Sequence, residues 1–255
     1  MTRRRHAVFT QQGHHAVTLA RAPAHSASTT TPKSSAASSD NAFQTPVQPP
    51  RSTFKRYLET LATQRWDDHR FYHQSRINQT LHLISAVSFL VAYVVLFIDP
   101  AVAALIGWGI SMVTRQTGHY VFEPRGFDHV NQVSDEHKEA IKVGYNMHRK
   151  NALIAVWLLI PLVLWLQPSL FGLIEPATSV NGWVHDVGMA WLALGVSGLL
   201  FRVGQLWVQQ DLLTGLAWMS KILTDPFHDI KMYWKSPLYL LRGQLIDPMV
   251  HVHHR

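Results

Sequence analysis

The sequence predicts an all-α, polytopic helical membrane protein with about four spans. Hydrophobic residues make up 47% of the 255 residues and charged residues only 15%, which is unusual for a soluble domain of this length. The apolar residues gather in uncharged runs long enough to cross a bilayer. The basic residues flank these runs and do not form a stripe on a soluble face, so we expect no nucleic-acid partner.

The first 52 residues are predicted to form a disordered basic tail. They are rich in Ser, Thr, Ala and Pro and lack aliphatic periodicity, so they cannot bury enough apolar surface to offset chain entropy. No acidic residue precedes Asp40, and this composition fits either an organelle transit peptide or a plain basic bacterial tail. The tail has no apolar stretch of the kind that marks a secretory signal.

Residues 53–208 are predicted to form the membrane domain. An amphipathic helix on the membrane is expected at residues 54–78, where apolar and aromatic side chains recur at helical spacing among charged ones. The eighteen uncharged residues 81–98 are then enough for a first span. Residues 101–113 are too few to cross, so the second span is re-entrant or continues through polar residues to His119.

Two further spans are expected at residues 152–174, interrupted by two prolines, and at residues 185–208. The distribution of Lys and Arg predicts their orientation. Eleven of these residues precede the first span, six lie between residues 114 and 150, five follow the last span, and the two short turns opposite have none. We therefore expect an integral protein of a bacterial inner membrane or an organelle membrane, with both termini cytosolic.

Residues 209–255 are predicted to be an interfacial helical tail or a cap over the cytosolic mouth. Aromatic and basic side chains are interleaved in this segment, which is typical of a membrane interface. Asp225, His228 and Asp229 are metal-ligand types, but an Asp-Pro pair commonly starts a turn. We therefore expect a turn at Asp225-Pro226.

Any metal site must use His, Asp or Glu, because the sequence has no cysteine and therefore no disulfide or thiolate ligand. Three pairs at four-residue spacing could each present two groups from one helix face. They are His69 with His73, Asn78 with His82, and His119 with Glu123. His73 and His82 would point to opposite faces of an unbroken helix, so a shared ion requires a break near residues 76–78.

Purely structural interpretations of these residues stay open beside the functional ones. A histidine at a membrane boundary can be an interfacial residue whose tip reaches water, and we interpret His129 and His185 in this way. Glu123 could be a metal ligand, a general base or a salt-bridge partner. His137 and His148 would lie roughly 16 Å apart along one helix, too far to share an ion.

Imidazoles with a carboxylate suit a non-haem iron centre, with positions left open for oxygen and substrate. Zinc is compatible with the same ligand types. A site at the edge of the hydrocarbon layer would admit a molecule with its acyl chain in the bilayer and its polar head at the metal. The expected partners are therefore a lipid or fatty acid, O2 and the membrane.

Two sequence blocks within residues 66–165 resemble a known family. The first reads Tyr72-His73, four residues, Asn78, three residues, His82, and the second reads Gln116-Thr-Gly118-His119-Tyr-Val-Phe122-Glu123. Blocks of this kind on either side of a membrane hairpin resemble the small membrane family that includes the fungal endoplasmic-reticulum 2-hydroxy fatty acid dioxygenase.

This resemblance implies an iron(II)-dependent enzyme that uses O2 to remove one carbon, as CO2, from a 2-hydroxy fatty acid (α-oxidation). It implies that His73, His82 and His119 are the iron ligands. It further implies that Asn78 and Glu123 are orienting or acid–base groups in catalysis. Among the other histidines of the same face, the secondary candidate ligands are His69, His137 and His148.

Two other functions stay open. A di-iron lipid hydroxylase or desaturase is suggested by the His69-x3-His73 pair, although the His-x2-His-His boxes of such enzymes do not occur. A non-enzymatic membrane scaffold or lipid-binding protein would keep its histidines at the interface and use its basic residues to hold anionic lipid. Metal content separates the three functions.

Overall fold

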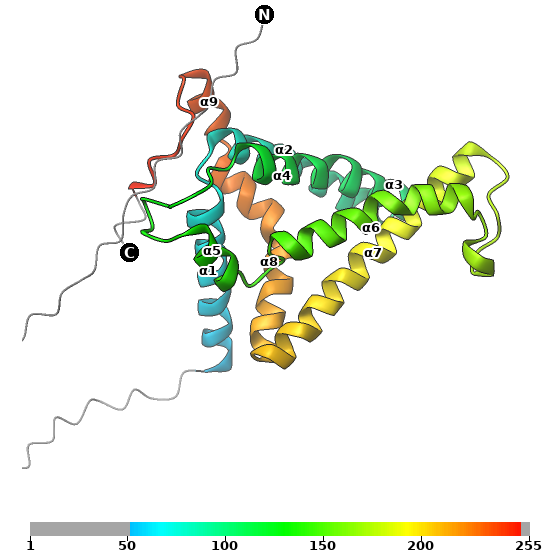
Figure 1. The fold of residues 1–255 in the computed structure, drawn as a ribbon, viewed down its shortest axis with the longest axis horizontal. Coiled ribbons are helices and arrows are strands. Elements are labelled where there is room, and N and C mark those ends of the chain that lie inside the picture. Colours follow the sequence, from blue (N-terminus) through cyan, green and yellow to red (C-terminus); the bar gives the residue numbers. More distant parts are fainter. Residues whose placement is uncertain (1–51, 251–255) are drawn as a thin grey trace, which may run out of the picture. The chain divides into compact units, whose positions relative to one another are not determined.

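A computed structural model of the chain describes residues 52–250 (Figure 1). Within that range the regular structure is helical, apart from isolated β-bridges that join Ser75 to Ile246 and Asp128 to Val133. The all-α prediction is therefore confirmed for these residues. The tail predicted at residues 1–52 lies outside the described range except for Ser52.

The first two helices are α1 (Thr53–Tyr72) and α2 (Arg76–Val95). Each begins after a serine, Ser52 or Ser75, whose hydroxyl accepts a hydrogen bond from a backbone N–H in the first turn. The chain leaves the helical conformation at residues 73–75 between them. The helix expected at residues 54–78 thus ends at Tyr72, and residues 76–78, where a break was expected, instead form the first turn of α2.

The next helical stretch continues from Pro100 to Phe122, and Asp99 caps its first turn. Its four consecutive segments are α3 (Pro100–Ile106), the π-helix η1 (Gly107–Met112), α4 (Val113–Thr117) and a second π-helix, η2 (Gly118–Phe122). The helix therefore continues through polar residues to His119, which is the longer of the two predicted forms. Glu123 is extended and ends it.

A short helix, α5 (Asp135–Ile141), leads into α6 (Met147–Leu166). Pro161 lies inside α6 and cannot donate to the carbonyl of Trp157. The indole Nε1 of Trp191 donates to this carbonyl over 3.1 Å instead. The helix therefore passes through Pro161 and ends at Leu166, earlier than the predicted limit of the third span.

After the 3-10 turn η3 (Leu170–Gly172), the chain forms α7 (Val180–Gln209), α8 (Leu212–Tyr233) and α9 (Ser236–Leu241). The turn predicted at Asp225-Pro226 is wrong, because α8 is uninterrupted there. The local Asp-Pro signal is overridden by burial, since α8 packs against α1, α2 and α7. This packing buries the polar side chains of Lys221, Asp225 and Asp229.

Three of the described helices, α2, α6 and α7, are long and apolar enough to cross a membrane. Large apolar side chains of α6 and α7, such as Leu158, Trp165 and Leu200, are exposed, and extended apolar surface of this kind suits contact with lipid. These features indicate a membrane protein. The predicted second span is divided among the segments of residues 100–122 and is not one of these three helices.

Candidate metal centre

Three histidines from separate segments meet in the interior. Nε2 of His73 lies 3.1 Å from Nδ1 and 3.2 Å from Nε2 of His82, and Nε2 of His82 lies 3.1 Å from Nε2 of His119. One ring nitrogen of each residue lies within 4.8 Å of the other two. His73 and His82 are 1% and 0% exposed. The break after α1, the helix α2 and the π-helix η2 thus supply one histidine each to a single cluster.

A backbone hydrogen bond fixes the nitrogen with which His73 faces the cluster. Its Nδ1 lies 2.9 Å from the carbonyl oxygen of Asp68. Because a carbonyl only accepts, Nδ1 carries the proton and Nε2 presents a lone pair. Burial holds the pKa of His73 well below its ordinary value, so the ring is neutral. This is the form in which imidazole binds metal ions.

Hydrogen bonds of Asn78 and Glu123 join the break after α1 to the end of η2. Oε1 of Glu123 accepts from the backbone N–H of Gln74 at 2.7 Å, and Oε2 accepts from Nδ2 of Asn78 at 2.6 Å. The same Asn78 nitrogen donates to the carbonyl of Tyr72 at 2.8 Å. Burial raises the pKa of Glu123 to about 7. These contacts are those of orienting groups, and a direct part in catalysis stays a prediction.

The glycine before the third histidine lets η2 lie directly against α2. A Cβ atom at Gly118 would lie 2.0 Å from Oδ1 and 3.3 Å from Cα of Asn78. Any larger residue would therefore push the two segments apart. Glycine immediately before His119 thus allows the close approach of η2 to α2, the helix that carries His82.

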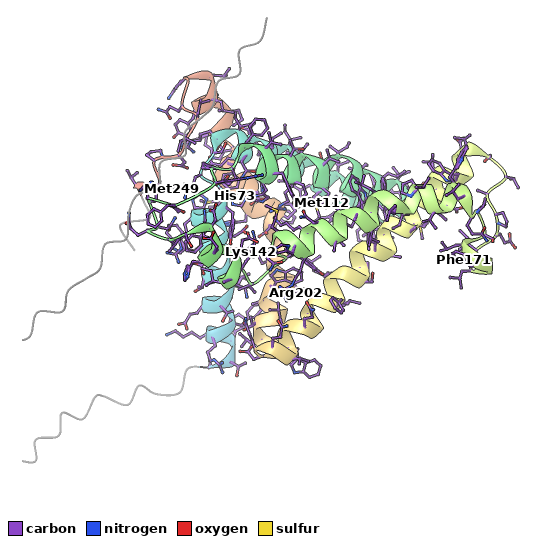
Figure 2. The ribbon with its side chains drawn as sticks, viewed as in Figure 1. His73, Met112, Lys142, Phe171, Arg202 and Met249 are labelled. Atoms are coloured by element: carbon purple, nitrogen blue, oxygen red, sulfur yellow. The ribbon has the colours of Figure 1, made fainter. Side chains whose placement is uncertain are left out.

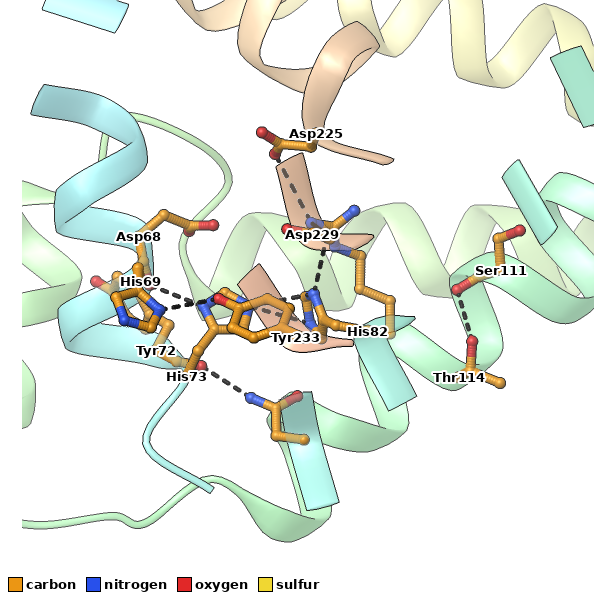
Figure 3. Close-up of polar contacts among 12 residues, drawn as sticks. Asp68, His69, Tyr72, His73, His82, Ser111, Thr114, Asp225, Asp229 and Tyr233 are labelled. Carbon is orange, nitrogen blue, oxygen red and sulfur yellow. Dashed lines mark hydrogen bonds and ion pairs between the residues drawn. The ribbon is translucent and has the colours of Figure 1, made fainter. Parts of the chain in front are cut away.

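Tyr233, at the end of α8, covers the cluster and was not expected from the sequence. Its ring stacks on His73 with centroids 5.4 Å apart and planes 24° apart, and its hydroxyl lies 3.0 Å from Nδ1 of His69 (Figure 3). Burial raises the pKa of the Tyr233 hydroxyl well above its ordinary value. His69 is therefore buried against Tyr233, next to the three-histidine cluster and not within it.

A buried ion network lies beside the cluster. Arg115 pairs with Asp229 at 3.1 Å and with Asp225 at 3.7 Å. Lys221 pairs with Asp225 at 2.7 Å and with Asp68 at 3.1 Å. Each cation thus contacts two carboxylates, and the network connects α1, α4 and α8 around the histidines.

The network also contacts the cluster directly. Oδ2 of Asp229 lies 3.5 Å from Nδ1 of His82, a position from which carboxylates commonly orient metal-binding imidazoles. The sequence did contain a signal for this contribution, because Lys221, Asp225 and Asp229 are four residues apart and share one face of a helix. The turn expected at Asp225-Pro226 concealed it.

A cavity of about 460 Å³ lies next to the cluster, and His119 forms part of its wall. Its lining is mostly apolar and comes from α1, α2, α3, η1, α6, α7 and α8, with Phe89, Trp108 and Leu153 among the larger side chains. Its volume is in the range of small-molecule sites. The polar lining includes Gln116, Lys142 and Lys150 together with the carboxylates of Asp67, Asp68 and Asp225.

The other candidate histidines lie apart from the cluster. His137 and His148 have exposed side chains, as do His129 and His185. Within residues 52–250, the three-histidine cluster is the one group of three or more His, Asp and Glu residues with the spacing of metal ligands.

The cluster fits a transition-metal ion on its donor chemistry. Two nitrogens bound to one ion at about 2.1 Å have a separation of about 3.0–3.4 Å for angles between 90° and the tetrahedral angle. The nitrogen separations of 3.1 and 3.2 Å agree with this range. Neutral imidazoles suit zinc, copper, iron and nickel, so the ligand set admits iron(II) without selecting it over zinc.

Comparison with known proteins adds no relative. No family model matches the chain, and neither curated proteins nor solved structures are detectably similar to it. The resemblance described above therefore stays an expectation, and the functional argument depends on the site.

Proposed function

We propose that the protein is an iron(II)-dependent dioxygenase that shortens 2-hydroxy fatty acids by one carbon at the cytosolic face of a membrane. In the overall reaction the 2-hydroxy acid and one O2 yield the fatty acid shorter by one carbon, CO2 and water. The observation that best supports this proposal is the cluster of His73, His82 and His119 beside a largely apolar cavity. A buried metal site next to apolar walls suits a substrate that carries a polar group on a long chain.

The residues around the cluster have distinct parts in this proposal. His73, His82 and His119 would hold the iron, and the carbonyl of Asp68 and the carboxylate of Asp229 orient two of the rings. Bound iron supplies the one-electron chemistry that the reaction of O2 with an organic substrate requires.

The apolar cavity wall has a role of its own in this proposal. It receives the acyl chain and keeps water from the reacting end. Phe89, Trp108 and Leu153 contribute to this wall. Excluding water strengthens the electrostatic interactions of the polar groups that remain in the site.

The same proposal includes the finer membrane arrangement. Residues 100–122 form a fourth, shorter crossing, and both termini lie on the cytosolic side of a bacterial inner membrane or an organelle membrane. The distribution of Lys and Arg among the connections supports this orientation.

The alternatives differ in metal content. A di-iron hydroxylase needs a second ligand set, and within residues 52–250 only one cluster has the required spacing, which favours one ion. A scaffold needs no metal at all. Zinc shares the ligand preference for imidazole, so the identity of the bound metal has to be measured.

The function is tested with 2-hydroxypalmitate as substrate. We expect O2-dependent release of CO2 and formation of the acid one carbon shorter, and we expect His119→Ala to abolish both because it removes one of three ligands. His185→Ala is the matched control, since that side chain is 57% exposed and lies outside the cluster. Full activity in the His119 variant, with unchanged membrane insertion, contradicts the proposal.

A further inference from the structure

The cavity beside the cluster contains two lysines without a carboxylate partner. Lys221 and Arg115 also line this cavity, but both are neutralised by ion pairs with aspartates. Lys142 and Lys150 make no ion pair in the part of the chain that the structure describes. These two side chains therefore have no carboxylate at ion-pair distance, and Asp68, which lines the same cavity, is paired with Lys221.

The surroundings of the two lysines make their positive charge costly. Lys142 follows α5 (Figure 2), and its Nζ lies 3.2 Å from the centroid of the Tyr72 ring. Burial lowers the pKa of Lys142, and Lys150 lies in the first turn of α6 within the same cavity wall. Cations removed from water without a partner destabilise a fold unless an anion joins them.

A second polar group in the cavity also lacks a partner. Oε1 of Gln116 is buried without a hydrogen bond, while the amide nitrogen of the same side chain contacts Sδ of Met112. Gln116 lies one turn before His119 and lines the same cavity. A buried acceptor without a donor is a binding position for a ligand hydroxyl or N–H group.

We infer that Lys142 and Lys150 bind the carboxylate of a long-chain acid and that Oε1 of Gln116 accepts a hydrogen bond from a hydroxyl on its second carbon. The acyl chain then extends along the apolar wall formed by α2, η1 and α7. This arrangement places the substituted carbon at the end of the cavity that His119 lines. The inference rests on the proposed function for the identity of the acid. What it adds is a binding subsite for the carboxylate and the 2-hydroxyl group.

The test measures binding without turnover. The full chain is purified in detergent, freed of metal with a chelator, and titrated with palmitate and with hexadecanol, which has the same chain but no charge. We expect the double variant Lys142→Met, Lys150→Met to bind palmitate about tenfold or more weakly, as for hydrogen bonds to charged groups, and hexadecanol as before. Lys231→Met, at an exposed position of α8, is the matched control and should bind both as the unaltered chain does.

Three results overturn the inference. One is unchanged palmitate binding in the double variant. Another is an equal loss for palmitate and hexadecanol, which would give the lysines only a structural part. A third is lysine-dependent binding of lysophosphatidate in place of palmitate, which would assign the lysines to a phospholipid headgroup. A thermal melt shows that the variants are folded, and we expect the double variant to melt close to the unaltered chain, because it removes partly buried charge that has no ion pair together with the contact of Lys142 with the Tyr72 ring.

The hydroxyl position has its own measurement. The unaltered chain should prefer 2-hydroxypalmitate to palmitate, and Gln116→Leu should lose this preference while it binds palmitate unchanged. A preference that survives in Gln116→Leu overturns the part assigned to Gln116. Because none of these titrations needs catalysis, a protein that binds the acids through its lysines but fails to shorten them would refute the proposed function and leave the subsite standing.

Discussion

At the residue scale, the site depends on side chains that set the orientation of others. His73 faces the cluster through Nε2 because the carbonyl of Asp68 engages its other nitrogen. Asn78 and Glu123 connect the loop that carries His73 to the end of η2. Such outer contacts commonly change metal affinity 10–100-fold when they are removed, an order-of-magnitude guide for this site as well.

The sharpest steric test at this scale is Gly118→Ala. The added Cβ would lie 2.0 Å from Oδ1 and 3.3 Å from Cα of Asn78, so either the Asn78 side chain leaves its hydrogen bonds with Glu123 and Tyr72 or η2 moves away from α2. We expect a loss of about 1–3 kcal/mol in the free energy of unfolding and metal affinity lower by about tenfold or more. Thermal melts and metal titration measure the two effects.

Gly109→Ala is the matched control for this substitution. Gly109 lies in the preceding π-helix η1, and a Cβ there would meet no atom within 4 Å. The control should therefore leave both the melting temperature and the metal affinity close to those of the unaltered chain. Equal behaviour of the two alanine variants contradicts the close approach of η2 to α2.

Residues of the site could be predicted from the sequence only where the spacing of nearby residues indicated them. The spacing of His73 and His82 required a break between them, and the chain does leave the helix at residues 73–75. Tyr233 carried no such signal, because it reaches the cluster from a helix about 150 residues further along the chain. Only tertiary packing places its ring on His73.

At the element scale, two π-helices interrupt the stretch from Pro100 to Phe122. A π-turn inserts an extra residue into a helix and is common at functional sites. His119 lies in the second of them. Sequence patterns do not specify such a turn, so neither π-helix was predicted.

The contact between α3 and α7 is the second element-scale feature. A Cβ on Gly188 would lie 2.6 Å from the carbonyl oxygen of Ala101 and 3.0 Å from its Cα. Small residues that let two helix backbones approach closely are typical of helix pairs in membranes. Residues of this size at the crossing therefore set the distance between the helices.

Gly188→Ala tests this packing. We expect a lower melting temperature, equivalent to about 1–3 kcal/mol for an overpacked position. Gly204→Ala lies in the same helix with open space around it, so it should melt at the same temperature or slightly higher, because alanine favours helix by about 0.5–1 kcal/mol. A Gly188 variant as stable as the Gly204 variant would show that the two helices are not in such close contact.

At the scale of the whole molecule, the site combines distant parts of the chain. The break after α1, the helix α2, the π-helix η2 and the end of α8 all contribute to it. The segment predicted as a tail at residues 209–255 therefore contributes Lys221, Asp225 and Asp229 to the buried ion network, as well as Tyr233. The sequence indicated that this segment is helical and rich in aromatic residues. The turn expected at Asp225-Pro226 prevented the prediction of one continuous helix with a buried polar face.

The proposed orientation can be tested with single cysteines, because the chain contains none. Thr178 lies in the connection before α7, which has no Lys or Arg, and Glu136 lies in α5, within the polar connection before α6; both are exposed. A membrane-impermeant maleimide should label Thr178→Cys in intact cells or right-side-out vesicles, and Glu136→Cys only after permeabilisation. The reverse pattern, or labelling of both from one side, contradicts the proposed topology.

The central claim is that His73, His82 and His119 together bind one metal ion, and the metal content of the protein tests it most directly. Purified full-length protein, loaded with iron(II) without oxygen and washed, should retain about one iron per chain, as expected for a single three-imidazole site. His119→Ala should retain almost none under the same treatment, while His185→Ala should match the unaltered chain. A folded, unaltered protein that retains no iron, or that retains about two per chain, would contradict the claim.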